Sequence, residues 1–209
     1  MPTILCPYCA KYSHVTLRWG QVFDSGAQVR AAASCDFCSR LSVVEGRDPS
    51  ASASPGFDLG SVGRVLDRAG SSVTWLPMSA ETPEVPDVPA PIERAAKEAY
   101  RSASIGNHMA AILMARTVIE ATAKTKGISN GVLASKINAM RDAQLIRPAI
   151  AEQAHEVRFA GNDMAHGDID LIPDAVDSEE ILALMASVLT EVFQDPARLE
   201  RIRAKRTGG

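Results

Sequence analysis

The sequence predicts a mainly α-helical protein, in which an antiparallel helical bundle follows a small N-terminal β module. Three observations carry this prediction. Four cysteines form two Cys-x-x-Cys pairs near the N-terminus, proline and glycine accumulate in the middle of the chain, and apolar residues recur at helical spacing from Pro91 onward. With 209 residues, of which 46% are apolar, the chain can build one good core and a smaller second module. We therefore expect the β module at residues 1–45, a linker and ambiguous segment at 46–84, the bundle at 85–195 and a basic C-terminal helix at 196–209.

The four cysteines have the spacing of a zinc ribbon. Cys6 and Cys9 in CPYC are followed, after 25 intervening residues, by Cys35 and Cys38 in CDFC. Each pair supplies two thiolates from one side of a tetrahedron, and four sulfurs leave no open position for water or substrate, so the predicted zinc is structural. Binding of roughly 10–16 kcal/mol would replace the core that so short a module cannot build alone. Two disulfides, or a redox-active pair, are the alternative, and His14 is expected to be a strand surface residue rather than a ligand.

Alternating apolar residues predict strands between and after the cysteine pairs. Val15, Leu17 and Trp19 fall on one face of the first strand, and Leu41 and Val43 repeat the pattern after the second pair. The module is therefore expected to consist of short strands held between two metal-binding turns.

The middle of the chain has the composition of a linker. GRDPSASASPG is flexible, and ETPEVPDVPAP is stiffer because its prolines favour extended backbone. Between them, residues 57–66 are compatible with a short helix and VTWL with a strand, but four glycines weaken both predictions. No internal repeat is apparent.

From Pro91 onward the periodicity predicts helices joined by short connections, which is typical of an antiparallel bundle. Asn107 is expected to cap the second helix, which ends at Gly127 and is apolar all round near its start, so it should be central. Asp177 and Glu180 have the spacing of a capping box for a later helix. The predicted helices cover residues 91–105, 108–126, 132–143, a stretch that begins near 148, 179–193 and 197–206.

Charge is distributed unevenly along the chain. The net charge is -3, which argues against a uniformly basic nucleic-acid binder, but residues 196–209 carry five Lys/Arg against one Asp/Glu. No run of about 18 uncharged apolar residues is present, and the N-terminus lacks the basic start and apolar block of a signal peptide. We expect a cytoplasmic protein with no membrane segment.

The fourth predicted helix carries a polar row beside its buried face. On a helical wheel the buried face comprises Ile150, Ala154, Val157, Gly161, Met164 and Ala165. The polar row comprises His155, Arg158, Asn162 and His166. Such a row fits either the flank of a packed helix or a site at a cleft or subunit boundary, and both interpretations stay open. A helix break at Gly161 and Asn162 would remove the alignment of Arg158 with His166.

Two charged residues lie inside the otherwise apolar second helix. Arg116 and Glu120 are one turn apart in AILMARTVIEATA, and a central helix buries charges only when they are paired. They are expected either to form a mutual salt bridge that fixes the register of the bundle or to reach the polar row of the fourth helix.

Four segments between Val85 and about Leu189 carry a resemblance to a known family. VPAPIERAAKEAY, GNHMAAILMARTVIEA, GVLASKI and VRFAGNDMAHGD resemble an uncharacterised bacterial domain family grouped with the HEPN superfamily of helical bundles, over about half of the chain. The resemblance implies a HEPN-like bundle, because members share that fold and often carry further modules such as zinc ribbons. Members of the uncharacterised family turn up beside restriction and defence genes. HEPN proteins are often homodimers, and many are metal-independent ribonucleases.

The same resemblance implies roles for five residues. It matches the ribonuclease arginine to Arg158 and the histidine to His166, with Asn162 between them, and the Arg and Glu of the second helix to Arg116 and Glu120. In that assignment His166 acts as general acid or base and Arg158 stabilises charge on the phosphate. The family motif has four to six residues between arginine and histidine, whereas this chain has seven. On a continuous helix that interval separates the two Cα atoms by about 12 Å.

Three functions are compatible with the sequence. We favour a nucleic-acid-directed binding or adaptor protein in bacterial or phage defence, because this function needs no catalytic geometry. Its zinc ribbon would contact RNA, DNA or a protein partner through Lys11, Arg18, Arg30 and Arg40, and its bundle would form a homodimer. The first alternative is a HEPN-type ribonuclease that uses the arginine and histidine named above. The second is a structural dimerisation or sensing module.

Overall fold

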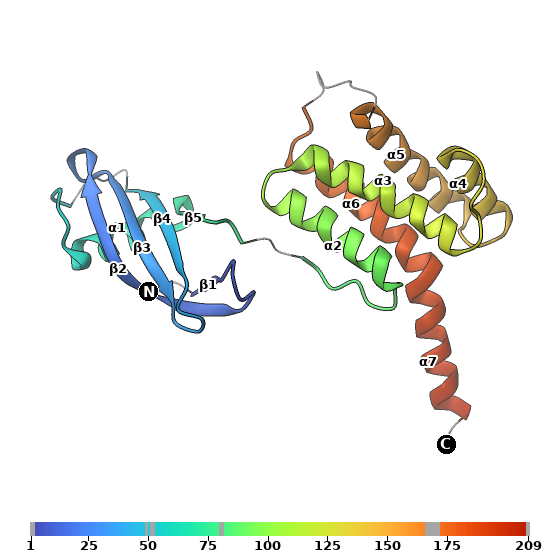
Figure 1. The fold of residues 1–209 in the computed structure, drawn as a ribbon, viewed down its shortest axis with the longest axis horizontal. Helices are drawn as coiled ribbons and strands as arrows, with labels where there is room; N and C mark the ends of the chain where they lie inside the picture. Colours follow the sequence, from blue (N-terminus) through green and yellow to red (C-terminus); the bar gives the residue numbers. More distant parts are fainter. Residues whose placement is uncertain (1–2, 49, 51–52, 80–81, 166–171, 208–209) are drawn as a thin grey trace. The chain divides into compact units, whose positions relative to one another are not determined.

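The structure is a computed structural model of the chain, and it describes residues 3–48, 50, 53–79, 82–165 and 172–207. The chain forms two compact units, Met1–Ser79 and Ala80–Gly209 (Figure 1). The first unit is a sheet covered by one helix, and the described residues of the second form helices and their connecting segments, with no strand among them. The first unit extends beyond the predicted boundary at residue 45, because a helix and a strand of the predicted linker pack on its sheet.

The sheet of the first unit is antiparallel throughout, in the order β1-β2-β3-β4-β5. The hairpin of β2 and β3 is longer than the predicted short strands, with 12 and 8 residues. Its turn contains a short 3-10 segment, Asp24–Gly26. The strands are β1 (Thr3–Leu5), β2 (Tyr12–Phe23), β3 (Gln28–Cys35), β4 (Leu41–Arg47) and β5 (Thr74–Leu76).

Helix α1 (Leu59–Ala69) covers one face of this sheet. The side chain of Asp58 caps it by accepting a hydrogen bond from the N–H of Ser61 at 2.8 Å. The helix approaches the sheet most closely at Gly20, where a Cβ atom would lie 2.7 Å from Val62. A core forms where the apolar face of α1 meets the inward residues of the strands. This core includes Val15, Leu17, Val22, Val29, Ala31, Ala33, Val44, Val62, Val65 and Leu66.

The predicted orientation of Trp19 is wrong. Val15 and Leu17 are buried as expected, but the pairing of β2 with β3 shifts register between Leu17 and Trp19. Because successive side chains of a strand alternate, this bulge turns Trp19 outward, where it is 50% exposed. Its ring lies against that of Phe57, with centroids 6.0 Å apart.

The predicted face of β4 is also reversed. Leu41 and Val43 are exposed, whereas Ser42 and Val44 are buried. The predicted alternation is present, but the position of α1 decides which face belongs to the core, and that contact is distant in sequence.

The second unit is a helical bundle around α3, which contacts α2, α4, α5 and α6. Its central place follows from its sequence, since Ala111, Ile112, Ala115, Val118 and Ile119 are all buried. The prediction of a mainly helical chain is confirmed. The helices are α2 (Ala90–Ser104), α3 (His108–Thr125), α4 (Leu133–Asp142), α5 (Pro148–Ala165), α6 (Ala175–Leu189) and α7 (Asp195–Thr207), with a π-helical stretch (Thr190–Gln194) between the last two.

Two predicted caps differ from the structure. Helix α6 begins one turn earlier than expected, because its capping box joins Asp174 to Asp177 rather than Asp177 to Glu180. Asn107 occupies the position before α3, but its side chain makes no capping hydrogen bond there. The bundle therefore has the predicted helices, and among α2, α3, α4 and α6 only α6 begins with a side-chain cap.

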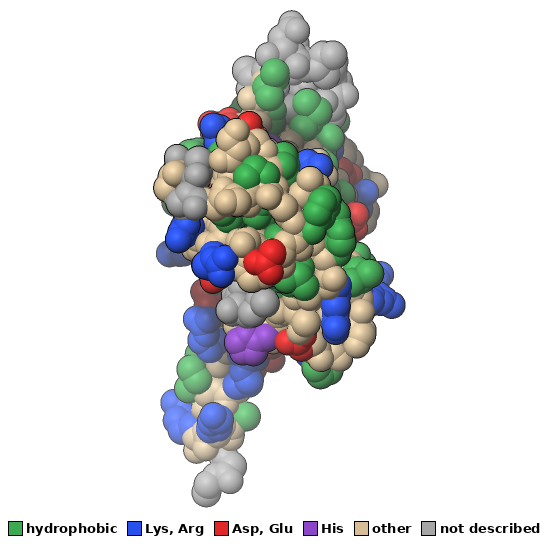
Figure 2. Space-filling view, turned by 90° about the vertical axis from the view of Figure 1, so that its left-hand side faces the viewer, with side chains coloured by type: hydrophobic (Ala, Val, Ile, Leu, Met, Phe, Trp, Pro, Cys, Tyr) green, Lys and Arg blue, Asp and Glu red, His purple; other side chains and the backbone are tan. Residues whose placement is uncertain are grey.

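The basic C-terminal helix is exposed along its length. None of the residues in α7 is buried, and Figure 2 shows Lys and Arg side chains gathered along it. Arg201 pairs with Asp87 at 2.6 Å, which ties α7 to the segment before α2. Within the described residues, no helix combines the length and apolar character that crossing a membrane requires.

Candidate functional site

The four predicted cysteine ligands meet in one cluster of the first unit. Cys6 and Cys9 lie between β1 and β2, and Cys35 and Cys38 lie at the end of β3 and before β4. Their four sulfur atoms all lie within 4.8 Å of one another, and all four thiols are free. The antiparallel pairing of β2 with β3 creates this meeting, because it brings the start of one strand beside the end of the other.

The two cysteine turns have the same construction. The N–H of Cys6 donates to the carbonyl of Lys11 at 3.0 Å, and the N–H of Ala10 donates back to the carbonyl of Cys6 at 3.0 Å. Ala10 has a positive φ of 53°, and Ser39 at the same place in the other turn has 60°. The second turn repeats the two hydrogen bonds at 3.0 and 2.8 Å, from Cys35 to Arg40 and from Ser39 to Cys35.

The cluster has the dimensions of a tetrahedral metal site. The sulfurs of Cys6 and Cys38 are 3.7 Å apart. A tetrahedral ion with metal–sulfur bonds of about 2.3 Å, as found in zinc sites, requires sulfurs about 3.8 Å apart. A disulfide would instead need a separation of about 2.05 Å. The residues present therefore fit a four-thiolate metal site.

The backbone of the second turn favours ionised sulfur. A hydrogen bond from the backbone of Cys38, together with one from the side chain of Ser13, lowers the pKa of the Cys35 thiol to about 6. Burial raises the pKa of the Cys9 thiol to about 11. A bound cation favours the thiolate form of all four cysteines, since metal ligation requires deprotonated sulfur.

The two turns carry a reciprocal pairing of rings and cations. The ammonium group of Lys11 lies 3.7 Å from the ring centroid of Phe37, and the guanidinium of Arg40 lies 5.4 Å from that of Tyr8. Each turn thus supplies the ring for the cation of the other. Phe37 is 61% exposed and Tyr8 is 39% exposed, which leaves ring surface open to solvent. We call Tyr8, Lys11, Phe37 and Arg40 the knuckle surface.

This surface contains two residues that the sequence interpretation missed. The hexapeptides CPYCAK and CDFCSR share an aromatic residue two places after the first cysteine and a cation five places after it. The repeat is too short to stand out along the whole chain, so Tyr8 and Phe37 are not among the residues that the sequence predicts for the site. A comparison of the two cysteine turns with each other would have found both.

Only two of the four basic residues predicted for the ribbon surface lie on the cysteine turns. Lys11 and Arg40 do so, as described above. Arg18 instead donates a hydrogen bond from Nε to the hydroxyl of Ser34 at 2.8 Å. Arg30, near the opposite end of β3, forms an ion pair with Glu45 at 2.6 Å.

In the second unit, the structure joins Arg116 to Asn162. Arg116 on α3 donates from Nε to the side-chain oxygen of Asn162 on α5 over 2.9 Å. Gly161 permits this contact, because a Cβ atom at that position would lie 2.6 Å from the Cβ of Arg116. The helix is not broken at Gly161 and Asn162, since α5 continues to Ala165.

Glu120 is held by three cations rather than by Arg116 alone. Lys136 and Lys124 lie 2.8 and 2.9 Å from its carboxylate, and Arg116 lies at 4.0 Å. Lys136 is only 4% exposed, so Glu120 neutralises a buried charge. Hydrogen bonds from Lys136 and then Lys124 lower the pKa of Glu120 to about 2.

Arg158 has a histidine neighbour that the sequence interpretation did not assign to the site. Its Nε donates to Nδ1 of His155 at 3.4 Å, and its guanidinium lies 3.7 Å from the ring centroid of Phe159. Nε2 of His155 lies 3.2 Å from the side-chain oxygen of Asn138. Burial, followed by the charge of Arg158, lowers the pKa of His155, which favours a neutral ring with its proton on Nε2.

Among the described residues, the members of the predicted catalytic set therefore have separate partners. Asn162 pairs with Arg116, whereas Arg158 pairs with His155. His166 lies outside the described residues. Arg158 follows His155 by three positions, and side chains at that spacing are neighbours on a helix surface, so the sequence itself predicts their contact.

The second unit corresponds to a known family. Residues 97–205, which are 109 of the 209 residues, match the family described as a domain of unknown function (DUF4145). No curated protein and no solved structure matches the chain. The matched segment contains Arg116, Glu120, Arg158 and Asn162, and the cysteine cluster lies outside it. By this match, the chain belongs to the DUF4145 family.

Proposed function

We propose that the protein is a zinc-containing binding and adaptor protein whose first unit contacts single-stranded nucleic acid through the knuckle surface. The observation that carries this proposal is the reciprocal ring–cation pairing across two cysteine turns. Neither ring is needed to complete the metal cluster, and both are exposed. They are therefore available for a partner.

Zinc is the metal that suits the cluster. Its preferred four-coordinate geometry with sulfur ligands matches the separation of the four cysteines, and thiolates select soft ions. When bound, zinc supplies a fixed geometry rather than a reactive position. The four cysteines would hold it and thereby keep the two turns in register, which places each ring beside its cation.

The chemistry of the knuckle surface fits nucleic acid with unpaired bases. A base stacks on an aromatic ring whatever its identity, and a neighbouring lysine or arginine neutralises the phosphate. Exposed rings suit single strands better than duplexes, because duplex bases are already stacked on each other. Phe37 and Tyr8 would receive bases, and Lys11 and Arg40 would meet the backbone.

Fluorescence anisotropy of a labelled 12-nucleotide RNA and DNA, titrated with the zinc-loaded full chain, tests the proposal. Tyr8→Ala and Phe37→Ala should each weaken binding about tenfold, since stacking contributes about 1–3 kcal/mol per base. Replacing Lys11 and Arg40 together by alanine should reduce the dependence of log K on log salt by about 1.4, the value for two phosphate contacts on a single strand.

Phe57→Ala is the matched control, because Phe57 is an exposed ring of the same unit outside the cysteine turns. It should leave the affinity unchanged. The proposal fails if the zinc-loaded chain binds neither oligonucleotide, or if removing Tyr8 and Phe37 affects binding no more than removing Phe57 does.

RNA cleavage by the second unit is the second candidate function. It is supported by the way Arg158 is held by His155 and Phe159, and by the resemblance to HEPN ribonucleases that matches Arg158, Asn162 and His166. Highly purified protein should then cleave unstructured RNA in the presence of a chelator, and His166→Ala should abolish cleavage without reducing the helical signal. His155→Ala separates the two histidines, since loss of activity with this variant alone would assign the proton transfer to His155.

The second unit would also supply dimerisation. A two-fold homodimer would place two knuckle surfaces on one particle, and tethered sites bind a long strand more tightly than one site does. From the resemblance to HEPN-superfamily domains we propose that such an adaptor acts in bacterial or phage defence. If neither unit binds nucleic acid, a protein partner or a purely structural dimerisation or sensing role is the remaining proposal.

A further inference from the structure

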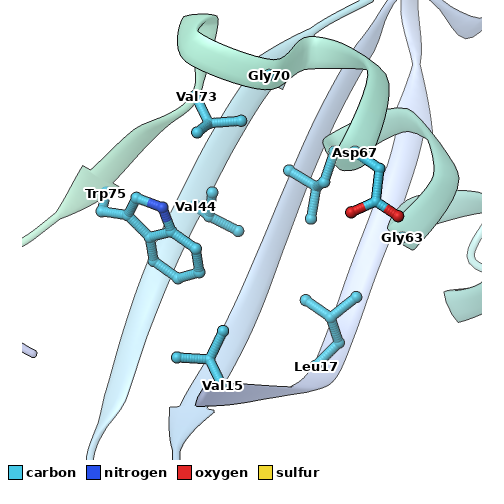
Figure 3. Close-up of a pocket in the computed structure, with 9 residues that line it drawn as sticks. Val15, Leu17, Val44, Gly63, Asp67, Gly70, Val73 and Trp75 are labelled. Atoms are coloured by element: carbon cyan, nitrogen blue, oxygen red, sulfur yellow. The ribbon is translucent and has the colours of Figure 1, made fainter. Parts of the chain in front are cut away.

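A pocket of about 350 Å³ lies between α1 and the sheet of the first unit (Figure 3). The pocket shares no residue with the knuckle surface, because none of the four knuckle residues lines it. Four of its nine lining residues are buried core residues, namely Val15, Leu17, Val44 and Leu66. Its volume lies at the lower end of the range for small-molecule sites, which is roughly 300–1,000 Å³.

The pocket exists because α1 is too short to cover the whole face of the sheet. Its 11 residues span about 16 Å, whereas the 12 residues of β2 span about 40 Å. The helix packs closely over Gly20 of β2 and over Gly46 of β4, where added Cβ atoms would lie 2.7 and 3.1 Å from Val62 and Ala69. The helix does not cover the part of the sheet face nearer the cysteine turns, and the pocket lies over that part.

Glycine keeps this recess open. Gly63 lies in the interior of α1, where glycine costs helix stability, yet it faces the pocket. A Cβ atom there would meet only the end of Leu17, at 3.9 Å, so a side chain would extend into free space. Gly70 also lines the pocket, and a Cβ atom at that position would meet nothing within 4 Å.

Two side chains give the pocket a chemical preference. The Trp75 indole lies on one side of the pocket and Asp67, carried by α1, on the other, and Val15 and Leu17 lie below both in the view of Figure 3. Asp67 is the one ionisable residue among those that line the pocket, and the described residues give it no ion pair. An ionised carboxylate accepts hydrogen bonds and donates none, so it favours a cationic donor.

We propose that this pocket binds a small arylalkylamine, with its ring against Trp75 and its ammonium group paired with Asp67. The apolar walls take up the ring, and the indole adds an aromatic contact of defined geometry. The carboxylate repels anions, which disfavours nucleotides and other phosphates at this site. The first unit thus has a small-molecule site in addition to the nucleic-acid surface proposed above, and the two do not depend on each other.

The test uses the full chain carrying Trp19→Phe, which leaves Trp75 as its single tryptophan. The probe is 2-phenylethylamine, compared with neutral 2-phenylethanol and anionic 3-phenylpropanoate, and the readout is tryptophan fluorescence checked by calorimetry. The amine should give a saturable change, the alcohol should bind about fivefold more weakly, and the carboxylate should bind least. This order of affinities is expected because the amine forms one partly exposed charge pair with Asp67, the alcohol forms none, and the carboxylate is repelled.

Two variants separate the contributions of charge and space. Asp67→Asn should remove the preference for the amine over the alcohol while the alcohol still binds. Gly63→Leu should abolish binding of the amine while circular dichroism shows an intact fold, since leucine is a better helix former than glycine. Gly60→Leu is the matched control, because it makes the same change in α1 at a glycine that does not line the pocket.

The outcomes are distinguishable. Saturable binding of the amine that is lost with Gly63→Leu and kept with Gly60→Leu establishes the site, and loss of selectivity with Asp67→Asn establishes its charge preference. The proposal is overturned if the amine does not saturate the protein at millimolar concentration, if the alcohol binds as tightly as the amine, or if binding survives Gly63→Leu.

Discussion

Arg116 on α3 and Asn162 on α5 are joined side chain to side chain, with the guanidinium Nε 2.9 Å from the amide oxygen. The stem of the same arginine lies against Gly161, so the two helices touch where one of them has no side chain. This contact links the charged turn of the central helix to the polar row of α5, and it was one of the two arrangements compatible with the sequence.

Gly161→Ala should destabilise the second unit by about 2 kcal/mol, because the new Cβ atom would lie 2.6 Å from that of Arg116 and the helices would have to move apart. Adding Arg116→Ala to Gly161→Ala should not restore the lost stability, since alanine keeps the Cβ atom at position 116 that would meet the new one. Gly63→Ala on α1 is the control, because a Cβ atom there would meet only Leu17 at 3.9 Å, and it should be neutral or stabilising by up to about 1 kcal/mol. Chemical denaturation measures all three, and equal stability of Gly161→Ala and the parent would contradict the packing described.

Glu120→Gln should destabilise the bundle at neutral pH by about 1–2 kcal/mol, because it leaves the buried ammonium of Lys136 without its counter-charge. The pKa of Glu120 is about 2 in the folded chain, below its ordinary value of 4.5, so the carboxylate stabilises the folded state fully above pH 4.5. That contribution is lost as the pH falls from 4.5 towards 2. The difference in stability between Glu120→Gln and the parent should therefore shrink over this pH window.

Lys124 and Lys136 provide the internal comparison for this prediction. Both contact the same carboxylate, but the Lys124 side chain is half exposed and that of Lys136 is buried. Lys124→Gln should cost less than about 0.5 kcal/mol, as is usual for surface pairs. A difference in stability for Glu120→Gln that does not change with pH would show that burial does not set the strength of this network. Equal losses of stability for Lys124→Gln and Lys136→Gln would show the same.

Metal analysis of purified protein should give about one zinc per chain, and Cys6→Ser or Cys38→Ser should lower that content. Chelation should remove amide-exchange protection from residues 6–11 and 35–40 while the second unit keeps its helical signal, because the cluster holds only the two turns. The core beneath α1 contributes apolar burial that the metal does not supply. Fresh protein that contains no zinc and has both cysteine pairs oxidised would rule out the metal site.

Light scattering at micromolar concentration should give twice the chain mass of 22.3 kDa. Phe159 is the residue to change, because it is 50% exposed on α5 beside Arg158 and offers apolar surface to a second copy. Phe159→Glu should yield the monomer, whereas Phe57→Glu in the first unit should not. A parent protein that is monomeric across this concentration range would exclude the homodimer.

The features that the sequence predicts well are those encoded over a few residues. Cysteine spacing identified the cluster, and apolar periodicity identified the helices from Pro91 onward. In both cases the determining residues lie within one turn or one helix, where geometry follows directly from the order of residues.

The features that were missed depend on contacts between distant segments. Trp19 is exposed because β2 has a bulge against β3, and the buried face of β4 is chosen by α1. The pocket likewise follows from how far α1 reaches across the sheet. Within α5, the polar row was predicted, but its pairing required the neighbouring helices: α3 supplies the partner of Asn162, and α4 supplies Asn138 for His155.

The reciprocal construction of the knuckle surface makes its two halves interdependent. Tyr8 meets its cation only through the second turn, and Phe37 meets its cation only through the first, so neither hexapeptide presents a complete pair by itself. Under the proposed function, the binding of zinc and the binding of an oligonucleotide are therefore thermodynamically coupled. By reciprocity, an oligonucleotide that holds the two turns together must raise the affinity of the cysteines for zinc by the same factor that zinc raises the affinity for the oligonucleotide.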